Sequence, residues 1–336
     1  MSTIGPFSTP ALTACLLALG AILVPLPSVA QALPAGCEVK ELATVPLQFT
    51  RNMLPIAEAS LNGTPIPALL DLGAQHATPI NKKTLERLGI NVRSSETNYP
   101  GVFVMHALID QFSLGPTEHK NSWFPVEDLK SDVIGAKIGA NYLLRTDLEI
   151  ALEAGYLKYF KPTGCYRAKL AYWDQKAASV ATRNDPRRRD LRPWFKVRIN
   201  GKDVDTVLST ANEHSYLDQF TAARMGLTPE SPGATREDPV TGWNERRQPV
   251  WSVPVASMTI GDLDVKDFSL RLMNLDLSGE MLVLGTDFLR RHRVYIAMSQ
   301  NRIYFTPVDA APVPQRPPTT LYTEAAPADS GRDQAP

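Results

Sequence analysis

The chain has 336 residues, of which 43% are hydrophobic and 21% are charged, which is ordinary for a soluble globular protein and enough for two modest cores. Lysine plus arginine and aspartate plus glutamate each total 35, so the formal net charge is zero. A chain without net charge has no global field that attracts nucleic acid or an anionic membrane surface, and we expect no nucleic-acid partner.

The N-terminal segment is apolar and ends in a pattern typical of signal-peptide cleavage. Residues 16–24 form an apolar run, and Ala30-Gln31-Ala32 gives the small residues that precede a cleavage site. We interpret residues 1–32 as a signal peptide, because the apolar run is short against the roughly 20 residues that span a bilayer. No lysine or arginine precedes the run, so a retained anchor or a wrongly assigned start is the alternative. A cleaved signal predicts a periplasmic or secreted protein without membrane association.

The cysteines fit an exported protein. Cleavage after residue 32 removes Cys15 and leaves Cys37 and Cys165 as a single pair. In an oxidising compartment such a pair predicts a disulfide, with two unpaired thiols as the alternative. The bond would close a long loop, for which the chain-entropy relation gives about 4 to 5 kcal/mol.

The first half of the chain contains a strand, turn and strand that lead into a short loop. Residues 53–61 alternate loosely, Asn62-Gly63 is a sequence typical of a type I′ hairpin turn, and residues 66–70 are apolar. The loop that follows, residues 71–74, reads Asp-Leu-Gly-Ala.

The second half repeats this unit. Residues 195–199 alternate, Asn200-Gly201 supplies the turn, and residues 204–208 lead into residues 209–212, which read Ser-Thr-Ala-Asn. The loop begins nine positions after the asparagine of the turn in both copies. A repeat that keeps its spacing predicts an internal duplication.

Further elements recur in the same order. A short helical segment with a glycine stop follows each loop, at residues 84–90 and 222–227. Each copy closes on a glycine-centred motif, at residues 138–145 and 284–291. We predict a first lobe, a linker, a second lobe and a disordered tail rich in proline and alanine, at residues 33–167, 168–192, 193–306 and 307–336.

An apolar strand that runs into Asp-x-Gly-Ala, followed by the glycine-centred motif, resembles the retropepsin-like aspartic protease family, and in particular its bacterial exported, two-lobed members. The resemblance extends from Leu47 to Phe305. It implies a mainly β fold of two retropepsin-like (acid protease) β-barrel lobes with short helices. A peptide or protein substrate would lie between the lobes, under a β-hairpin flap.

The resemblance implies peptide-bond hydrolysis by two carboxylates that share one proton, one as general base and one as general acid. It places the first catalytic carboxylate at Asp71, in a loop that keeps Gly73 and Ala74. Leu72 stands where the family has a threonine, whose hydroxyl bonds across to the partner lobe. The first loop therefore keeps the carboxylate and lacks the bridging hydroxyl.

The second loop departs from the family in the complementary way. Thr210 is present, but Ser209 replaces the aspartate and Ala211 replaces the glycine. A symmetric cleft within one chain would place Asp71 opposite Ser209. A serine hydroxyl cannot act as an ionised base near neutral pH, so the second site is degenerate.

Two hypotheses follow. The chain is an exported aspartic endopeptidase that activates water at Asp71 with the help of another acid or of a second chain in a homodimer; a monomer is the simpler expectation. The alternative is an inactive pseudoprotease that binds an extended peptide by strand addition. The acids near the second loop are interpreted as surface residues, and they are Asp205, Glu213 and Asp218.

Several other residues are candidates for substrate contacts. Gly139 and Gly285 lie in the closing motifs, and Tyr99 and Trp243 fall where the two flaps are expected. His76 and His214 each follow a loop by five positions, and we interpret both as polar residues beside the loop and not as ligands. Motifs for zinc, redox or nucleotide chemistry are absent from the sequence, so we predict neither a metal nor a cofactor.

Overall fold

The computed structural model describes residues 33–75, 78–97, 101, 103–185, 190–241, 247–274 and 281–309. The chain divides into two units, residues 1–32 and 33–336, and the described residues all belong to the second. The predicted signal peptide and nearly all of the predicted tail lie outside the described residues, as do His76, Tyr99 and Trp243. In the described part of the chain, no helix is both long and apolar enough to cross a membrane.

The first copy forms an eight-stranded sheet that contains a closed barrel. Its strands are β2 (Gln48–Phe49), β3 (Pro55–Leu61), β4 (Thr64–Asp71), β5 (Ile80–Asn81), β6 (Val92–Glu96), β7 (Phe103–Leu114), β8 (Thr117–Glu127) and β9 (Ala136–Gly139). They follow the order β2-β3-β4-β9-β5-β8-β7-β6, and β3 pairs with β7 as well. This extra pairing closes β3, β4, β9, β5, β8 and β7 into a ring.

The second copy repeats this ring. Its strands are β14 (Asp190–Ile199), β15 (Lys202–Leu208), β16 (Tyr216–Asp218), β17 (Thr235–Thr241), β18 (Arg247–Pro254), β19 (Met258–Ile260), β20 (Leu263–Asp264), β21 (Ser269–Met273) and β22 (Leu282–Leu284). The consecutive strands β18 and β19 together correspond to β7. Arg198 pairs with Thr259, as Ser60 pairs with Ser113 in the first copy. Arg198 lies 138 residues after Ser60, and Thr259 lies 146 residues after Ser113, which are the offsets between equivalent positions of the two copies. The predicted fold class, mainly β with two lobes from a duplication, is confirmed.

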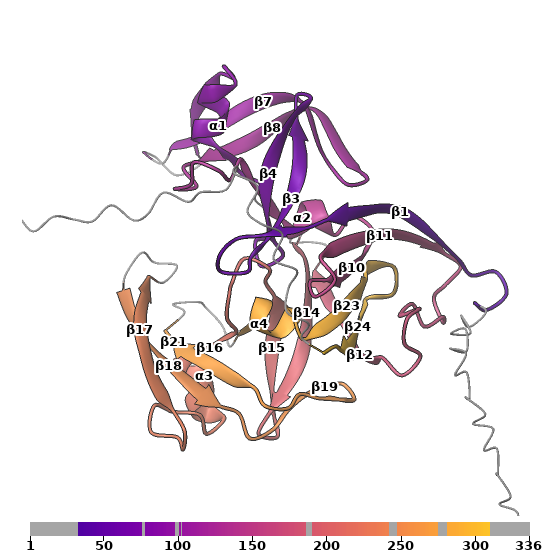
Figure 1. Ribbon diagram of the computed structural model, residues 1–336, viewed down its shortest axis with the longest axis vertical. Coiled ribbons are helices and arrows are strands. Elements are labelled where there is room, and N and C mark those ends of the chain that lie inside the picture. Colours follow the sequence, from indigo (N-terminus) through magenta and orange to yellow (C-terminus); the bar gives the residue numbers. More distant parts are fainter. Residues whose placement is uncertain are drawn as a thin grey trace, which may run out of the picture. The chain divides into compact units, whose positions relative to one another are not determined.

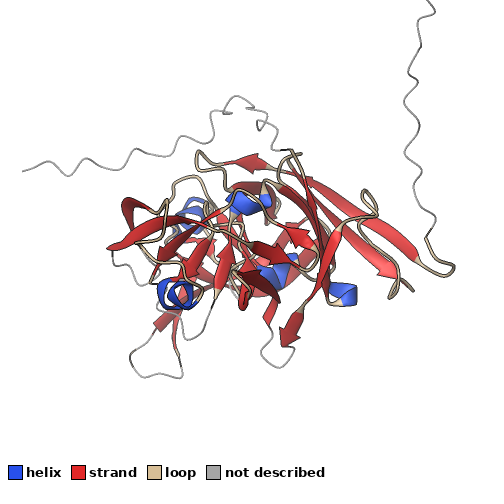
Figure 2. Ribbon diagram, turned by 90° about the horizontal axis from the view of Figure 1, so that it is seen from below, coloured by secondary structure: helices blue, strands red, loops and turns tan. Residues whose placement is uncertain are grey.

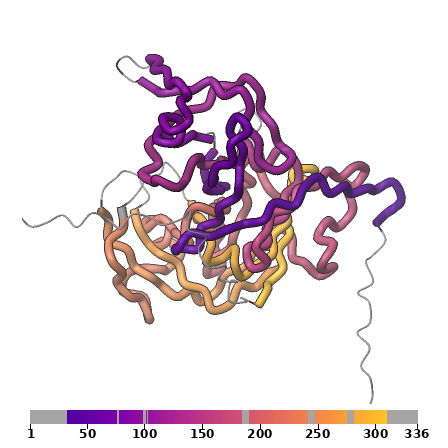
Figure 3. Tube along the Cα trace, turned by 45° about the horizontal axis from the view of Figure 1, so that its top comes forward, coloured from indigo at the N-terminus to yellow at the C-terminus, as the bar shows by residue number. Residues whose placement is uncertain are grey.

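A third sheet, which the sequence did not predict, joins the two copies (Figure 1). Its order is β1-β11-β10-β23-β24-β12, and its strands are β1 (Glu38–Pro46), β10 (Asp147–Ala151), β11 (Tyr156–Thr163), β12 (Ala178–Ala181), β23 (His292–Ala297) and β24 (Arg302–Pro307). In Figure 3 the yellow C-terminal strands lie beside strands of the first copy.

Strands β10 and β23, which the duplication makes equivalent, pair with each other in antiparallel orientation. Glu149 lies opposite Tyr295, and these two residues occupy equivalent positions in the two copies, 146 residues apart. A residue that faces its own equivalent across an antiparallel pair lies on a two-fold axis. The duplicated lobes are therefore related by a pseudo-two-fold axis that passes between β10 and β23.

The helices are short, as Figure 2 shows. They are α1 (Lys82–Arg87), α2 (Ala140–Leu143), α3 (Gln219–Arg224) and α4 (Thr286–Leu289), with a 3₁₀ turn, η2, at Met298–Gln300. Helices α1 and α3 follow the predicted loops, and α2 and α4 lie in the glycine-centred motifs. The side chains of Asn81 and Asp218 cap the N-termini of α1 and α3 by accepting backbone N–H bonds. The predicted glycine stops, Gly89 and Gly226, have φ values of 66° and 74°, so the two helices end where the sequence predicted.

The predicted hairpin turns are confirmed. Asn62 and Gly63 have φ values of 48° and 81°, and Asn200 and Gly201 have values of 47° and 80°. Positive φ at both central positions defines the type I′ turn, which asparagine followed by glycine adopts with little strain. Each turn joins the two strands that carry a loop into the centre of the molecule.

The segment predicted as a linker, residues 168–192, takes part in the fold. It contains β12, which pairs with β24, and β13 (Arg183–Asp185), which pairs with β14. Leu170 and Ala171 are buried against the third sheet, in a cluster that includes Tyr295. The segment is polar on average, which led to its interpretation as a linker, but its few apolar residues pack against the third sheet. The basic run at residues 187–189 lies outside the described residues.

The predicted disulfide is present between Cys37 and Cys165. It joins the residue before β1 to a residue shortly after β11, and these two strands pair along their length from Glu38 and Thr163 onward. The bond fixes the beginning of the described chain to the end of the first copy.

Candidate functional site

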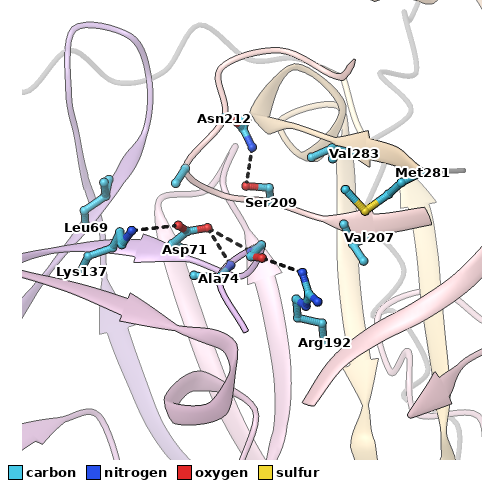
Figure 4. A pocket seen from close by; sticks show the side chains of 12 residues that line it. Leu69, Asp71, Ala74, Lys137, Arg192, Val207, Ser209, Asn212, Met281 and Val283 are labelled. Atoms are coloured by element: carbon cyan, nitrogen blue, oxygen red, sulfur yellow. Dashed lines mark hydrogen bonds and ion pairs between the residues drawn. The ribbon is translucent and has the colours of Figure 1, made fainter. Parts of the chain in front are cut away.

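The two predicted loops meet between the lobes. Asp71 ends β4 and pairs in parallel register with Gly139 of β9. Ser209 follows β15, whose last residue, Leu208, pairs with Leu284 of β22 in the same way. The parallel strand beside each loop directs it out of its barrel, and Figure 4 shows Asp71 and Ser209 lining one pocket. The structure thus places Asp71 beside Ser209, as the duplication predicts.

The Asp71 carboxylate is held by its own loop and by a lysine. Oδ1 accepts hydrogen bonds from the backbone N–H groups of Gly73, at 3.0 Å, and Ala74, at 3.1 Å. Oδ2 lies 4.0 Å from Nζ of Lys137. Burial raises the pKa of Asp71, although Lys137, the two N–H groups and the Ser209 hydroxyl each favour the ionised form. The carboxylate thus has several partners and no second carboxylate beside it among the described residues that line the cavity.

Gly73 permits the close approach of the two loops. A Cβ atom at Gly73 would lie 2.8 Å from Oγ and 2.9 Å from Cβ of Ser209, closer than unbonded heavy atoms pack. Ser209 is buried, and its Oγ accepts a hydrogen bond from Nδ2 of Asn212 at 2.9 Å. The glycine that the family pattern requires is needed here because another chain segment occupies the space of a side chain.

Thr210 links the two lobes. Its Oγ1 donates a hydrogen bond to the carbonyl oxygen of Leu70, at 2.6 Å, and accepts one from the backbone N–H of Leu72, at 3.1 Å. Leu72, the equivalent residue of the first copy, is buried and apolar, so the return bond is missing. The bridge that the family makes from both sides is made here from one side.

Replacement of Thr210 by valine is expected to lower the free energy of unfolding by about 2 kcal/mol, because it leaves the buried N–H of Leu72 without its acceptor. Urea unfolding followed by tryptophan fluorescence measures the change. Thr235→Val, at an exposed position of β17, is the control and should stay within about 0.5 kcal/mol of the wild type. Equal stability of the two variants would show that the bridge contributes nothing.

A cavity of about 470 Å³ opens at these loops (Figure 4). Ten of its twelve lining residues form pairs that the duplication makes equivalent: Leu69 with Val207, Asp71 with Ser209, Gly73 with Ala211, Ala74 with Asn212, and Lys137 with Val283. The other two are Arg192 and Met281. A cavity lined by equivalent pairs lies on the pseudo-two-fold axis, which is where the family resemblance places the substrate.

Two cations break the symmetry of the cavity, and neither was predicted from the sequence. Lys137 stands where the second copy has Val283. Arg192 forms an ion pair with Asp190 at 2.8 Å and donates to the carbonyl oxygen of Gly73 at 3.2 Å. An alignment of β9 with β22 would have revealed Lys137, because it places this charged residue against the apolar Val283 of the second copy. Arg192 lay in the segment interpreted as a linker.

The acids near the second loop have other roles. Asp205 pairs with Lys196 and Arg183, and the pKa of Asp205 is lowered because these hydrogen bonds and charges outweigh its partial burial. Asp218 caps α3, and Glu213 is exposed beside His214, with 3.3 Å between Oε1 and Nε2. Asp71 is the one carboxylate among the described residues that line the cavity.

The other predicted site residues flank the cavity or lie outside the described residues. Gly139 and Gly285 precede α2 and α4 and lie behind the loops, not in the described lining of the cavity. A Cβ at Gly285 would lie 2.5 Å from the carbonyl oxygen of His214, so this glycine admits the second loop. Strands β6 and β7, and β17 and β18, form hairpins where the two flaps are expected, and residues 98–100, 102 and 242–246 of these hairpins lie outside the described residues. Substrate contact by these residues stays a prediction.

Asp71→Asn is expected to raise the free energy of unfolding at pH 7 by about 1 kcal/mol. Burial raises the pKa of Asp71 in the folded state, so the folded protein binds more protons than the unfolded chain between the two pKa values. The stability of the wild type therefore falls as the pH rises from about 4 through the folded-state value. Asparagine keeps an acceptor for the N–H groups of Gly73 and Ala74.

Urea unfolding of both proteins at pH 7 and below pH 4 checks this expectation. The advantage of the variant should disappear at the lower pH, where the wild-type carboxyl is protonated in both states. Asp203→Asn, at an exposed ion pair, is the control. A variant less stable than the wild type at pH 7 would mean that the ionised carboxylate stabilises the fold.

Comparison with known proteins supports the predicted resemblance. Residues 195–291 match the family model described as "gag-polyprotein putative aspartyl protease". The match falls on the second copy, which carries Ser209 in place of the aspartate. Among solved structures, the crystal structure of basic 7S globulin from soybean is similar, with a TM-score of 0.44 and 15% identity over 82% of this chain and 96% of that one. No curated protein sequence matches the chain.

Proposed function

We propose that this chain is a pseudoprotease: a protein of aspartic-protease type that binds peptides between its lobes and does not hydrolyse them. The observation that carries the proposal is the pair of residues on the pseudo-two-fold axis, where Asp71 faces the hydroxyl of Ser209. Hydrolysis by this fold needs one carboxylate to activate water while another donates a proton to the scissile carbonyl. A single carboxylate cannot take both parts in one step.

The cation beside Asp71 supports the same conclusion. Among the described residues that line the cavity, the charged group nearest to Oδ2 is Nζ of Lys137, at 4.0 Å, and not a second carboxylate; burial raises the pKa of Asp71 although the charge of Lys137 opposes this rise. Oδ1 already accepts two backbone N–H bonds, from Gly73 and Ala74. The carboxylate is therefore anchored in its loop and has no partner with which to share a proton.

The features that bind a peptide are retained. The cavity combines polar groups around Asp71 with the aliphatic side chains of Leu69, Val207 and Val283. The hairpins β6–β7 and β17–β18 stand where flaps cover the substrate in the resembled family, and their backbones suit the capture of an extended segment by strand addition. An endopeptidase and a binding protein need this cleft equally.

An exported location completes the proposal. The Cys37–Cys165 disulfide is of a kind that persists in an oxidising compartment. The apolar run at residues 16–24, followed by Ala30-Gln31-Ala32, supports secretion through a cleaved signal. We propose a periplasmic or secreted protein.

The test is incubation of the protein with a mixture of random short peptides at acidic and at neutral pH, beside Asp71→Asn. Mass spectrometry measures cleavage in solution, and retention on the immobilised protein measures binding. We expect saturable retention without cleavage by both proteins. Ala211→Trp, which fills the cavity from the second loop, should lose retention.

The outcomes separate the two hypotheses. Cleavage by the wild type that disappears in Asp71→Asn would establish an aspartic endopeptidase and overturn the proposal. Absence of both cleavage and retention would exclude peptide binding. Retention that survives Ala211→Trp would place the peptide site elsewhere. Circular dichroism of that variant is the control that shows whether it folds.

A further inference from the structure

The polar side chains that line the cavity supply more hydrogen-bond donors than acceptors. Among the described lining residues, Asp71 brings the one carboxylate, and hydrogen-bond donors come from Lys137, Arg192, Ser209 and Asn212. One oxygen of Asp71 is already occupied by the N–H groups of its own loop. A cavity with more donors than acceptors favours a ligand that supplies acceptors.

Lys137 is the donor best placed to receive such a ligand. Its side chain is 29% exposed, and its ion pair with Asp71 spans 4.0 Å, beyond hydrogen-bond distance. Arg192, in contrast, makes short bonds with Asp190 and also donates to the carbonyl oxygen of Gly73. The ammonium group of Lys137 can therefore take up a ligand oxygen without giving up a short bond of the fold.

The second loop leaves room for an anionic group. Serine at position 209 lines the cavity of about 470 Å³ and is shorter than the aspartate that the duplication pattern expects there. Nδ2 of Asn212 and Oγ of Ser209 form a polar wall at this point, 2.9 Å apart. Because burial favours a protonated Asp71, a second carboxyl group is tolerated beside it through a shared proton.

The rest of the lining is aliphatic. Val207, Met281 and Val283 form a small buried cluster on the side of the second lobe, away from Lys137 (Figure 4). Such a wall accepts an aliphatic side chain next to the charged group.

We infer, on the basis of the proposed function, that the cavity selects peptides by a carboxylate, which binds Lys137 in the cavity that Asp71 and Ser209 also line. The carboxylate comes from an acidic side chain or from the peptide C-terminus. A charge-assisted hydrogen bond is stronger than a neutral one, so an acidic peptide should bind about tenfold more tightly than its amide counterpart.

Two libraries of random short peptides test the inference, one with free and one with amidated C-termini. Each is passed over the immobilised wild type, Lys137→Met and Lys161→Met. Lys161 lies exposed on β11 and is the matched control. Mass spectrometry gives the enrichment of carboxylates in the retained fraction. We expect about tenfold enrichment with the wild type and with Lys161→Met, and none with Lys137→Met.

The results distinguish the source of the carboxylate, and they separate a failure of this inference from a failure of the proposed function. If the retained fraction from the amidated library is enriched in glutamate and aspartate, the ligand group is a side chain; about tenfold greater retention of the free library than of the amidated library identifies the C-terminus. Equal retention of the two libraries by the wild type, without enrichment in acidic residues, overturns this inference and leaves the proposed function standing. Enrichment that persists in Lys137→Met also overturns it. Absence of any retained peptide overturns the proposed function itself.

Discussion

Replacement of both Cys37 and Cys165 by serine is expected to lower the free energy of unfolding by about 5 kcal/mol. The two residues are 128 positions apart, and the chain-entropy relation gives this value for the closure of a loop of that length. Loss of the bond enlarges the conformational freedom of the unfolded chain much more than it disturbs the folded protein, because β1 and β11 stay paired. Denaturant unfolding of the variant and the wild type measures the difference.

Reduction of the wild type gives an independent measure of the same quantity. A reductant should lower the unfolding midpoint of the wild type to that of the double serine variant and leave the variant itself unchanged. A variant as stable as the oxidised wild type would show that the unfolded chain is already restricted in this region.

Glu149→Met is expected to lower the free energy of unfolding by about 3 kcal/mol, because it leaves Arg293 without its buried partner. The Glu149 side chain is inaccessible to solvent, and Arg293 donates to its Oε1 from Nη2 at 2.6 Å and from Nε at 2.8 Å. The hydroxyl groups of Tyr156 and Tyr172 donate to the same carboxylate. Since Glu149 lies on β10 and Arg293 on β23, this cluster joins the two copies.

The double variant Glu149→Met/Arg293→Met separates charge from packing. An apolar pair of similar volume frequently replaces a buried ion pair with little loss, so we expect the second substitution to restore at least half of the stability lost. Asp203→Asn, which breaks an exposed pair with Arg198, should change stability by less than about 1 kcal/mol. A single variant as stable as this control would contradict the role assigned to the cluster.

Local patterns in the sequence were sufficient to predict much of each lobe. The turn at Asn62-Gly63, the helix stop at Gly89 and their repeats are set by backbone preferences within a few residues. The equal spacing of such features in both copies revealed the duplication, and hence that Asp71 and Ser209 occupy equivalent positions. These predictions needed no knowledge of long-range packing.

The third sheet could not be predicted in this way. Its central pairing joins Leu148 to Ile296, and no local signal connects strands so far apart. Glu149 is a polar residue in a buried strand, and its partner Arg293 becomes visible only when the two copies are placed around their common axis. Pairings of this kind arise from tertiary contacts that override local preference.

The candidate site could be predicted only in part, again because its geometry depends on tertiary contacts. Motif spacing located the two loops, but Lys137 is a single charge in a short apolar strand, and the sequence does not say which face of that strand it occupies. Asn212 stands where the first copy has Ala74, and its position in the sequence marks only the end of a loop. These two residues give the cavity its excess of donors, and their importance follows from the geometry of the axis.

The central claim, that a site with one carboxylate binds peptides without hydrolysing them, is tested most directly by the fate of peptides known to be bound. Peptides retained by the immobilised protein are incubated with an excess of wild type across the range from acidic to neutral pH, and mass spectrometry quantifies intact peptide and fragments. The account predicts that all bound peptide is recovered intact, as it is with Asp71→Asn. Fragments that form with the wild type and are absent with Asp71→Asn would contradict it.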